Sequence, residues 1–254
     1  MSTEVITKKG LSKCALQIIA IISMLVDHMA YSFVSNVSLY YYILRLVGKI
    51  SIIIMCYFVA EGYFKTRNIG KYILRMGIFA AISQIPYYLF LTQGHIIENP
   101  KALILSVFNT RNVIFTLFIG LCLLTVVKSN YRMWVKILAT VAAMFLVRDS
   151  DWDYYAVMWI IGFGVFHNCK WKQGVWAAVV LAVKIILAAP PAIQSVINIG
   201  ALTYGMLDWF VMFGGFLAIP FIMNYNGERG ANLKWGFYAF YPLHLLIIAL
   251  IVIF

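Results

Sequence analysis

The chain has 254 residues, of which 63% are hydrophobic and only 11% are charged. Because a soluble domain carries about 25% charged residues, this composition excludes an ordinary soluble protein and predicts a single integral-membrane domain over residues 1–254. The net charge of +11 would point to nucleic acid only if the cations gathered on one folded surface, whereas they lie in short connections between apolar runs. We therefore expect the lipid bilayer, and no nucleic acid, to surround this chain.

Apolar runs of helical length predict an all-α bundle of about nine transmembrane helices, with eight to eleven as the range. The runs cover residues 14–35, 39–63, 71–92, 112–128, 133–148, 153–168, 173–189, 206–224 and 235–254. The Pro190-Pro191 pair is expected to end the seventh run and to leave residues 190–204 as a further short or re-entrant helix. The stretch from Lys101 to Phe108 is a similar candidate before the fourth run.

Basic residues mark every second connection between these runs. They are Lys8, Lys9, Lys13, Lys65, Arg67, Lys71, Lys128, Arg132, Lys136, Lys170, Lys172, Arg229 and Lys234. Because connections rich in Lys and Arg stay in the cytoplasm, the N-terminus is predicted to be cytoplasmic. An odd number of spans would place the C-terminus on the outer side.

The first apolar run, ALQIIAIISMLVDHMAYSFV, contains the adjacent residues Asp27 and His28. Ionisable groups at membrane depth are costly, and histidine is the side chain best suited to proton exchange near neutral pH, so the pair predicts chemistry or proton movement. The alternative is a polar pair that only joins helices. Neighbouring helix residues point in different directions, so an orienting partner for His28 is expected from another helix, or from Asp27 only if the helix is broken.

Arg45 and Lys49 lie four residues apart and share a face of the second predicted helix. Arg45 is close enough to the outer surface for its side chain to reach the interface, whereas Lys49 lies near the middle of the membrane. Lys49 therefore needs a buried partner, such as Asp27, or an anionic ligand that enters the bundle.

The segment EGYFKTRNIGKYILR gathers charged residues at the predicted cytoplasmic face, namely Glu61, Lys65, Arg67, Lys71 and Arg75. Topology and attraction to anionic lipid headgroups would explain a basic connection here. Guanidinium groups also suit the geometry of phosphate, so the alternative is a docking site for a phosphorylated cytosolic cofactor. The residues alone leave both interpretations open.

Polar residues also gather on the predicted outer side. Asn112 begins the fourth run, and the loop DSDWDYY contributes Asp149, Asp151, Trp152, Asp153, Tyr154 and Tyr155. The simpler interpretation of this acidic, aromatic loop is an interfacial segment in an aromatic belt, and the alternative is recognition of a cationic or sugar-like acceptor. A lone histidine on an apolar helix is more often a structural hydrogen-bond donor, which is the interpretation for His244. No role is assigned to His95 or His167.

Several ordered blocks of the chain resemble the TraX family, named for the conjugal-transfer protein that acetylates F-type pilin. The blocks are IIAIISMLVDHMA; RLVGKISIIIMCYFVAEGYFKTRN followed by KYILRMGIFAAISQIPYYL; Asn112-Val113 with FTLFIGL; NYNGERG; and FYAFYPLHLL. The family is similar to the wider group of multi-span acyltransferases, which use cytosolic acyl-CoA and a histidine in an early span. The resemblance implies an acyltransferase of the bacterial cell membrane, with acetyl-CoA as co-substrate and an acceptor at the membrane.

The resemblance carries the family's histidine over to His28, and its pocket candidates lie at matching positions. The positions matched by the resemblance are His28, Asp27, Arg45, Lys49, Glu61, Arg67, Arg75 and Asn112. Together with the residue patterns above, they predict catalytic roles for His28, Asp27 and Lys49; cofactor binding by Arg45, Glu61, Lys65, Arg67, Lys71 and Arg75; and acceptor binding by Asn112, Asp151, Asp153 and Tyr154. His28 would be the general base, and Lys49 or Arg45 would face the charge that develops on the thioester oxygen. Direct transfer is the preferred mechanism, and an acetyl-histidine intermediate is the alternative.

The acceptor stays open between a peptide N-terminus and a sugar, because DSDWDYY stands where the family leads us to expect a plainer Asp-Tyr-Gly-like stretch. A proton-coupled transporter or flippase that uses Asp27, His28 and Lys49 is the second class of function. A structural scaffold is the third, and it would leave the buried charges without a purpose. A homo-oligomer is compatible with each of these classes. The four cysteines are scattered, so no metal site is expected.

Overall fold

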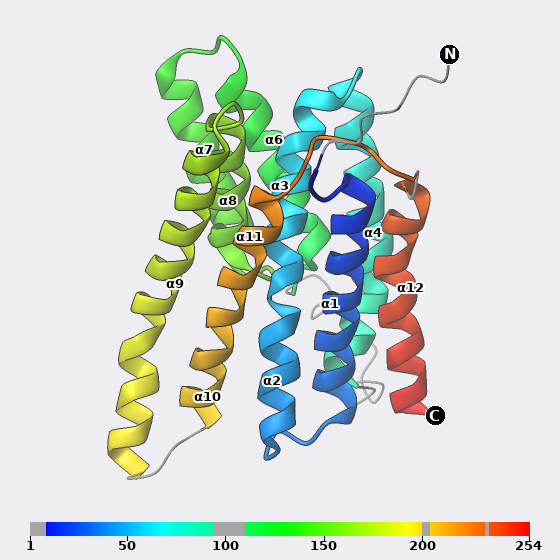
Figure 1. Cartoon of the computed structure of the whole chain (residues 1–254), viewed down its shortest axis with the longest axis vertical. Coiled ribbons are helices and arrows are strands. Elements are labelled where there is room, and N and C mark those ends of the chain that lie inside the picture. Colours follow the sequence, from blue (N-terminus) through cyan, green and yellow to red (C-terminus); the bar gives the residue numbers. More distant parts are fainter. Residues whose placement is uncertain (1–8, 94–109, 200–203, 232–233) are drawn as a thin grey trace.

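The computed structural model describes residues 9–93, 110–199, 204–231 and 234–254, and over these ranges the chain is helical without a β-strand. Figure 1 shows one bundle whose helices run along its long axis. The elements are α1 (Lys13–Phe33), α2 (Leu39–Gly48), α3 (Ile50–Lys65), α4 (Ile69–Thr92), α6 (Val113–Lys128), α7 (Met133–Val147), α8 (Asp153–Val165), α9 (Lys170–Ile199), α10 (Tyr204–Val211), the 3₁₀ helix η1 (Met212–Leu217), α11 (Ala218–Met223) and α12 (Lys234–Ile253). The predicted all-α bundle is confirmed.

The described helices fall into nine segments that match the nine predicted runs in order. Six segments are long and apolar enough to cross a membrane: α1, α2 with α3, α4, α9, α10 with η1 and α11, and α12. The other three, α6, α7 and α8, have 16, 15 and 13 residues. At 1.5 Å per residue these three extend about 20–24 Å, which is less than the roughly 30 Å hydrocarbon core. The protein is a polytopic helical membrane protein in which three of the described segments, α6, α7 and α8, are shorter than the hydrocarbon core.

Polar caps begin several helices where the apolar runs start. The side chains of Ser12, Ser38, Asn68 and Asn112 each accept a hydrogen bond from a backbone N–H of the first turn of α1, α2, α4 and α6. Such caps satisfy donors that have no partner within the helix, and this need is greatest where water is scarce. The starts of these helices are therefore specified locally by the sequence.

Two predicted boundaries differ from the structure. The second run is interrupted at Lys49, between α2 and α3. Conversely, α9 continues through Pro190 and Pro191 to Ile199, so the expected break and the separate helix after it are wrong. Each proline removes one backbone donor, yet membrane helices tolerate such losses where the local backbone and its neighbours satisfy the freed carbonyls. The candidate helix from Lys101 to Phe108 lies outside the described residues.

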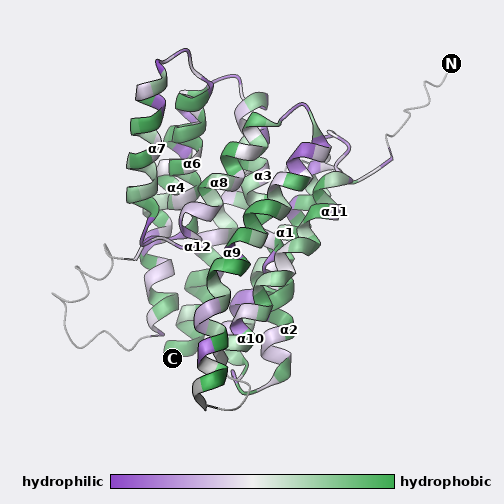
Figure 2. Cartoon of the chain, turned by 90° about the vertical axis from the view of Figure 1, so that its left-hand side faces the viewer, coloured by the Kyte–Doolittle hydropathy of each residue, from purple (hydrophilic) through white to green (hydrophobic). Residues whose placement is uncertain are grey.

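Helix α3 forms the centre of the bundle. Its residues from Ile50 to Glu61 are buried almost throughout, and Ile53, Ile54 and Cys56 have no exposed surface. It packs against α1, α6, α8 and α11, while α4 packs against α6 and α12. Figure 2 shows hydrophobic residues along the outer helices and hydrophilic residues mainly in the connections at the ends. The outer surface is thus suited to lipid.

The two ends of the bundle differ. We call the end where α1 begins and α3 ends the basic end. Helix α12 finishes at the opposite end, while α6, α7 and α8 occupy the half nearer the basic end (Figure 1). Where α8 begins, the backbone N–H of Asp151 donates to the carbonyl of Arg111 at 2.9 Å. The loop of residues 148–152 is therefore tied to the start of α6 part-way along the bundle.

The crossing of α1 and α2 requires a glycine. A Cβ atom at Gly48 would lie 2.3 Å from the Cβ atom of Asp27. Because both atoms belong to the stems of their side chains, the helices would have to move apart. We predict that Gly48→Ala lowers the free energy of unfolding by about 1–3 kcal/mol, as overpacking does.

The matched control is Gly236→Ala in α12, since no atom lies within 4 Å of the Cβ position there. Thermal unfolding of the purified protein in detergent measures both variants. Equal melting temperatures for the two variants would contradict the predicted close contact.

Candidate functional site

Two cavities lie back to back inside the bundle. The basic cavity, of about 710 Å³, is lined at the basic end by Lys13, Lys65, Arg67, Arg75 and Arg229. The acid–base cavity, of about 580 Å³, reaches toward the opposite end and is lined by Asp27, His28, Arg45, Lys49, Asp151, Asp153, Lys184 and Asp208, among others. Met24, Met55 and Tyr241 line both. The two cavities therefore approach each other in the middle of the bundle.

Asp27 of α1 holds the two cations of the second span. Its Oδ2 atom lies 2.8 Å from Nη1 of Arg45, and its Oδ1 atom lies 3.5 Å from Nζ of Lys49. All three side chains are mostly buried. Lys49 therefore has Asp27 as the buried partner that its depth requires, and the pairing spans the interruption between α2 and α3.

The sequence predicts that Arg45 binds the cofactor together with basic residues of the next connection. In the structure Arg45 lies in a different cavity from them. Besides its ion pair with Asp27, its guanidinium lies 5.4 Å from the ring centroid of Tyr31 and 5.8 Å from that of Tyr41. These contacts place it in the acid–base cavity. The structure thus separates Arg45 from Lys65, Arg67 and Arg75.

His28 faces α12 and α4 rather than Asp27. Its Nδ1 atom lies 2.7 Å from Nε2 of His244, and its ring packs 4.9 Å from that of Phe90. Nδ1 of His244 lies in turn 2.7 Å from the carbonyl oxygen of Phe240. Helix α1 continues unbroken past Asp27, so the adjacent carboxylate points elsewhere. The partner of the His28 ring comes from another helix.

The acidic loop lies at the acid–base cavity rather than at an exposed rim. The hydroxyl of Thr116 is 2.8 Å from the carbonyl oxygen of Asp151 and 2.9 Å from Oγ of Ser150, which fixes the loop against α6. Asp151, Trp152 and Asp153 line the cavity. Asp149 remains exposed. The short helices α6 to α8 explain this position, because they bring the loop inside the length of the bundle.

Two cations contact the aromatic rings of this loop region. Nζ of Lys184 lies 4.2 Å from the ring centroid of Tyr155 and 5.4 Å from that of Trp152. Nζ of Lys49 lies 5.4 Å from the centroid of the Trp152 ring. Trp152 therefore joins the interruption between α2 and α3 to α9 through its contacts with both cations.

Two predicted acceptor residues lie outside both cavities. Asn112 is buried, caps α6, and donates from Nδ2 to the carbonyl of Ala80 at 2.8 Å and to Oε1 of Gln84 at 2.7 Å. It joins α4 to α6. Tyr154 has 40% of its surface exposed and lines neither cavity. The geometry thus gives Asn112 a structural position and leaves Asp151 and Asp153 beside the cavity.

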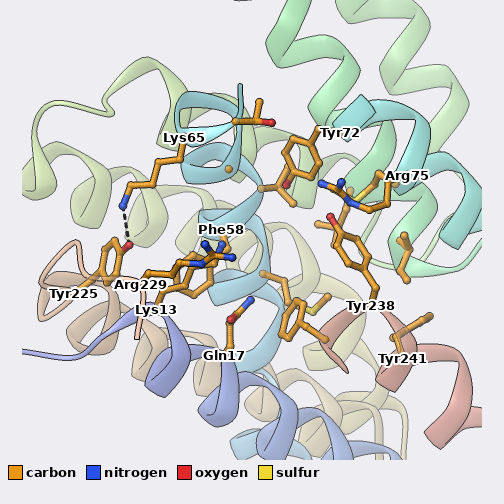
Figure 3. A pocket seen from close by; sticks show the side chains of 18 of the residues that line it. Lys13, Gln17, Phe58, Lys65, Tyr72, Arg75, Tyr225, Arg229, Tyr238 and Tyr241 are labelled. Carbon is orange, nitrogen blue, oxygen red and sulfur yellow. Dashed lines mark hydrogen bonds between the residues drawn. The ribbon is translucent and has the colours of Figure 1, made fainter. Parts of the chain in front are cut away.

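The basic cavity combines cations with aromatic rings, as Figure 3 shows. The guanidinium of Arg75 lies 5.4 Å from the ring centroid of Tyr72 and 5.2 Å from that of Tyr238. Its buried Nε atom has no hydrogen-bond partner among the described residues. Lys65 donates at 3.0 Å to the hydroxyl of Tyr225. Such donors, with rings beside them, suit a phosphorylated aromatic ligand.

Glu61 and Lys71, also predicted to bind a cofactor, do not line the basic cavity. Glu61 is buried, with its carboxylate 2.8 Å from Nζ of Lys65 and 3.0 Å from Nε2 of His167. It therefore connects α3 to the segment between α8 and α9, and positions Lys65. Lys71 is exposed on α4.

Sequence reasoning missed several residues that the structure brings to the site. Lys184 and Asp208 are single charges in apolar runs, and this signal alone marks functional candidates in a membrane protein. The sequence alone predicts only a structural role for His244. From the sequence, Lys13 and Arg229 indicate only which side of the membrane their connections face. Nothing local shows that the start of α1 and the connection of residues 224–231 meet at one cavity.

The chain is similar to known proteins over most of its length. The family described as TraX protein matches residues 12–252 of the chain. A Dichelobacter nodosus protein named "Probable fimbrial assembly protein FimC, serogroup H1" is 31% identical over 236 residues, which cover 92% of each chain. No solved structure matches.

The ion pairs of Asp27 generate a stability prediction. Asp27→Asn would leave Arg45 and Lys49 without a counter-charge in a mostly buried position, and breaking a buried pair costs about 3–5 kcal/mol. We expect a clear fall in the melting temperature of the detergent-solubilised protein. Asp149→Asn is the control, since its contact with Arg148 is long at 3.9 Å and exposed, and surface changes stay within about 0.5 kcal/mol. An Asp27→Asn variant that melts like the control would contradict the assigned role of Asp27.

Proposed function

The chain belongs to the TraX family, and on this premise we propose that it is a membrane-embedded acetyltransferase. It moves an acetyl group from cytosolic acetyl-CoA to an amine or hydroxyl of an acceptor on the outer side of the bacterial cell membrane. The observation that carries this proposal is the pair of cavities that share Met24, Met55 and Tyr241. A donor and an acceptor could enter from opposite sides and meet there.

The basic cavity is the proposed donor site. The basic end is cytoplasmic by the distribution of Lys and Arg. Acetyl-CoA presents a diphosphate, a further phosphate and an adenine ring, which match the cations and tyrosines of this cavity. Arg75 supports this fit most directly, because its buried Nε atom has no partner and its guanidinium lies between Tyr72 and Tyr238. The volume of about 710 Å³ falls in the range of small-molecule sites.

His28 is the proposed general base, and Lys49 the proposed source of positive charge. His28 lines the acid–base cavity, where an acceptor proton could be removed. An ammonium has three N–H donors, so Lys49 can keep its contact with Asp27 and still direct a donor toward a developing oxyanion. Asp27 acts indirectly, since its carboxylate holds Lys49 and Arg45.

The acid–base cavity is the proposed acceptor site. Within the described ranges, the carboxylates of Asp151 and Asp208 line it and form no ion pair. The lining carries four carboxylates and three cations, and this excess of negative charge favours a cationic group, which supports an amine over a hydroxyl as the acceptor. The name of the Dichelobacter relative makes a pilus subunit one candidate carrier of that amine.

A proton-coupled transporter is the second candidate, because cavities toward both ends also suit alternating exposure of a substrate. It predicts proton or substrate flux through proteoliposomes in the absence of acyl-CoA. The acetyltransferase predicts acetyl transfer that requires acetyl-CoA. Reconstitution of the purified protein with each measurement in parallel separates the two.

The donor site generates the next prediction. Acetyl-CoA should raise the melting temperature of the purified protein, since a ligand at 100 times its Kd adds about 2.7 kcal/mol. Arg75→Ala should weaken acetyl-CoA binding about tenfold or more, through the loss of charge-assisted hydrogen bonds. Lys71→Ala is the control, because Lys71 belongs to the same charged segment but lies outside the cavity. Equal affinity losses in both variants would remove Arg75 from the donor site, and no shift in the natural protein would exclude this donor.

The catalytic assignment is tested separately. His28→Ala should reduce acetyl transfer by about 10²–10⁴-fold, the usual contribution of a general base. It should leave stabilisation by acetyl-CoA unchanged, since His28 does not line the basic cavity. Incorporation of radiolabelled acetyl groups into membranes of cells that contain the protein measures the transfer. Asp149→Asn is the control, because Asp149 is exposed and lies outside both cavities. Undiminished transfer by His28→Ala would overturn the assignment.

A further inference from the structure

Two imidazoles and a carbonyl form a chain across the middle of the bundle. Nδ1 of His28 lies 2.7 Å from Nε2 of His244, and Nδ1 of His244 lies 2.7 Å from the carbonyl oxygen of Phe240. The two imidazole planes differ by only 11°, with their centroids 5.0 Å apart. The first contact connects α1 to α12, and the second lies within α12.

The donors and acceptors in this chain are fixed by chemistry. A carbonyl oxygen only accepts, so Nδ1 of His244 must carry the proton in that contact. In neutral His244 the other nitrogen, Nε2, is then an acceptor. Nδ1 of His28 must therefore donate to it. The remaining nitrogen of neutral His28, Nε2, is left with a free lone pair.

We propose that His244 is a positioning residue that fixes the tautomer of His28, so that Nε2 of His28 is the basic atom. This inference rests on the proposed acetyl transfer. Nε2 takes the proton from the attacking amine or hydroxyl as that nitrogen or oxygen bonds the acetyl carbon. When the carbon–sulfur bond breaks, Nε2 passes this proton to the thiolate sulfur, and CoA leaves as the free thiol. Throughout the step Nδ1–H of His28 stays bonded to His244, which stabilises the transient imidazolium.

The surroundings support His244 rather than Asp27 in this role. The carboxylate of Asp27 is held by Arg45 and Lys49, and it leaves α1 in a different direction from the His28 ring. His244 is buried, and its ring packs 4.5 Å from that of Phe240 with an interplanar angle of 11°. The side chain that orients His28 is thus itself held in place.

Two substitutions at residue 244 separate orientation from packing. His244→Phe keeps an aromatic ring beside Phe240 but removes the acceptor for Nδ1–H of His28. In His244→Gln the amide oxygen can occupy the place of Nε2 and accept the same hydrogen bond. Full-length protein in lipid nanodiscs, with isotopically labelled histidine, reports the His28 tautomer by nitrogen NMR. Since the chain has only four histidines, substitution of His28 identifies its signal.

We expect the natural protein and His244→Gln to show His28 protonated at Nδ1 and not at Nε2. His244→Phe should lose this preference and lower kcat by about 10²–10⁴-fold, as loss of the orienting group does in related acid–base arrangements. Stabilisation by acetyl-CoA should stay the same in all three proteins. If His244 were only structural, its substitution would change the melting temperature but not the His28 tautomer. His244→Gln would then be no more active than His244→Phe.

Several results would overturn the inference. They are protonation of Nε2 in the natural protein, an unchanged tautomer and kcat in folded His244→Phe, or a loss in folded His244→Gln as large as in His244→Phe. If His244→Phe does not fold, the natural protein and His244→Gln still decide the question. Failure of the natural protein to transfer acetyl groups would instead count against the proposed function, since the tautomer is measured independently of activity.

Discussion

The ion pairs of Asp27 are the interaction on which the site depends. Charges buried in a membrane protein must be compensated within it, and Asp27 compensates two cations of the neighbouring span at once. This requires α1 and α2 to cross closely, which the glycine at position 48 permits. It also holds the interruption at Lys49 in a fixed place. Because His28 follows Asp27 on an unbroken helix, the same pairing turns the imidazole toward α4 and α12.

The short helices α6, α7 and α8 explain why the two cavities differ. Their connection at residues 148–152 ends inside the bundle, where irregular backbone is tolerated only if it is covered by protein or lines a cavity. Thr116 donates to the carbonyl of Asp151, and the backbone N–H of Asp151 donates to the carbonyl of Arg111, so these groups are satisfied. Asp151 and Asp153 therefore reach the acid–base cavity, where they lie with cations of the longer helices such as Lys49 and Lys184. The carboxylates that this loop adds to the acid–base cavity thus follow from helix length.

Much of the fold could be predicted from the sequence, because the length of an apolar run and the polar residue at its start are local signals for a membrane helix. The nine segments required nothing more, and the burial of Lys49 followed from its place in an apolar run. The course of α9 through Pro190 could not be predicted, since local rules disfavour proline inside helices. The site was predicted in part: helix geometry showed that the His28 partner belongs to another helix. Its identity required the fold, because 216 residues separate His28 from His244.

A second imidazole suits this place better than the carboxylate found in many acid–base pairs. A carboxylate beside His28 would be ionised, and the nearby guanidinium and ammonium of Arg45 and Lys49 would compete for it, as they already hold Asp27. An imidazole accepts the Nδ1–H hydrogen bond while neutral, so it adds no charge to the low-dielectric interior before the reaction. Charge appears only when His28 takes a proton, and that is when the hydrogen bond to His244 becomes strongest. In this low-dielectric environment, a neutral hydrogen-bond acceptor orients the base without the free-energy cost of burying a further charge.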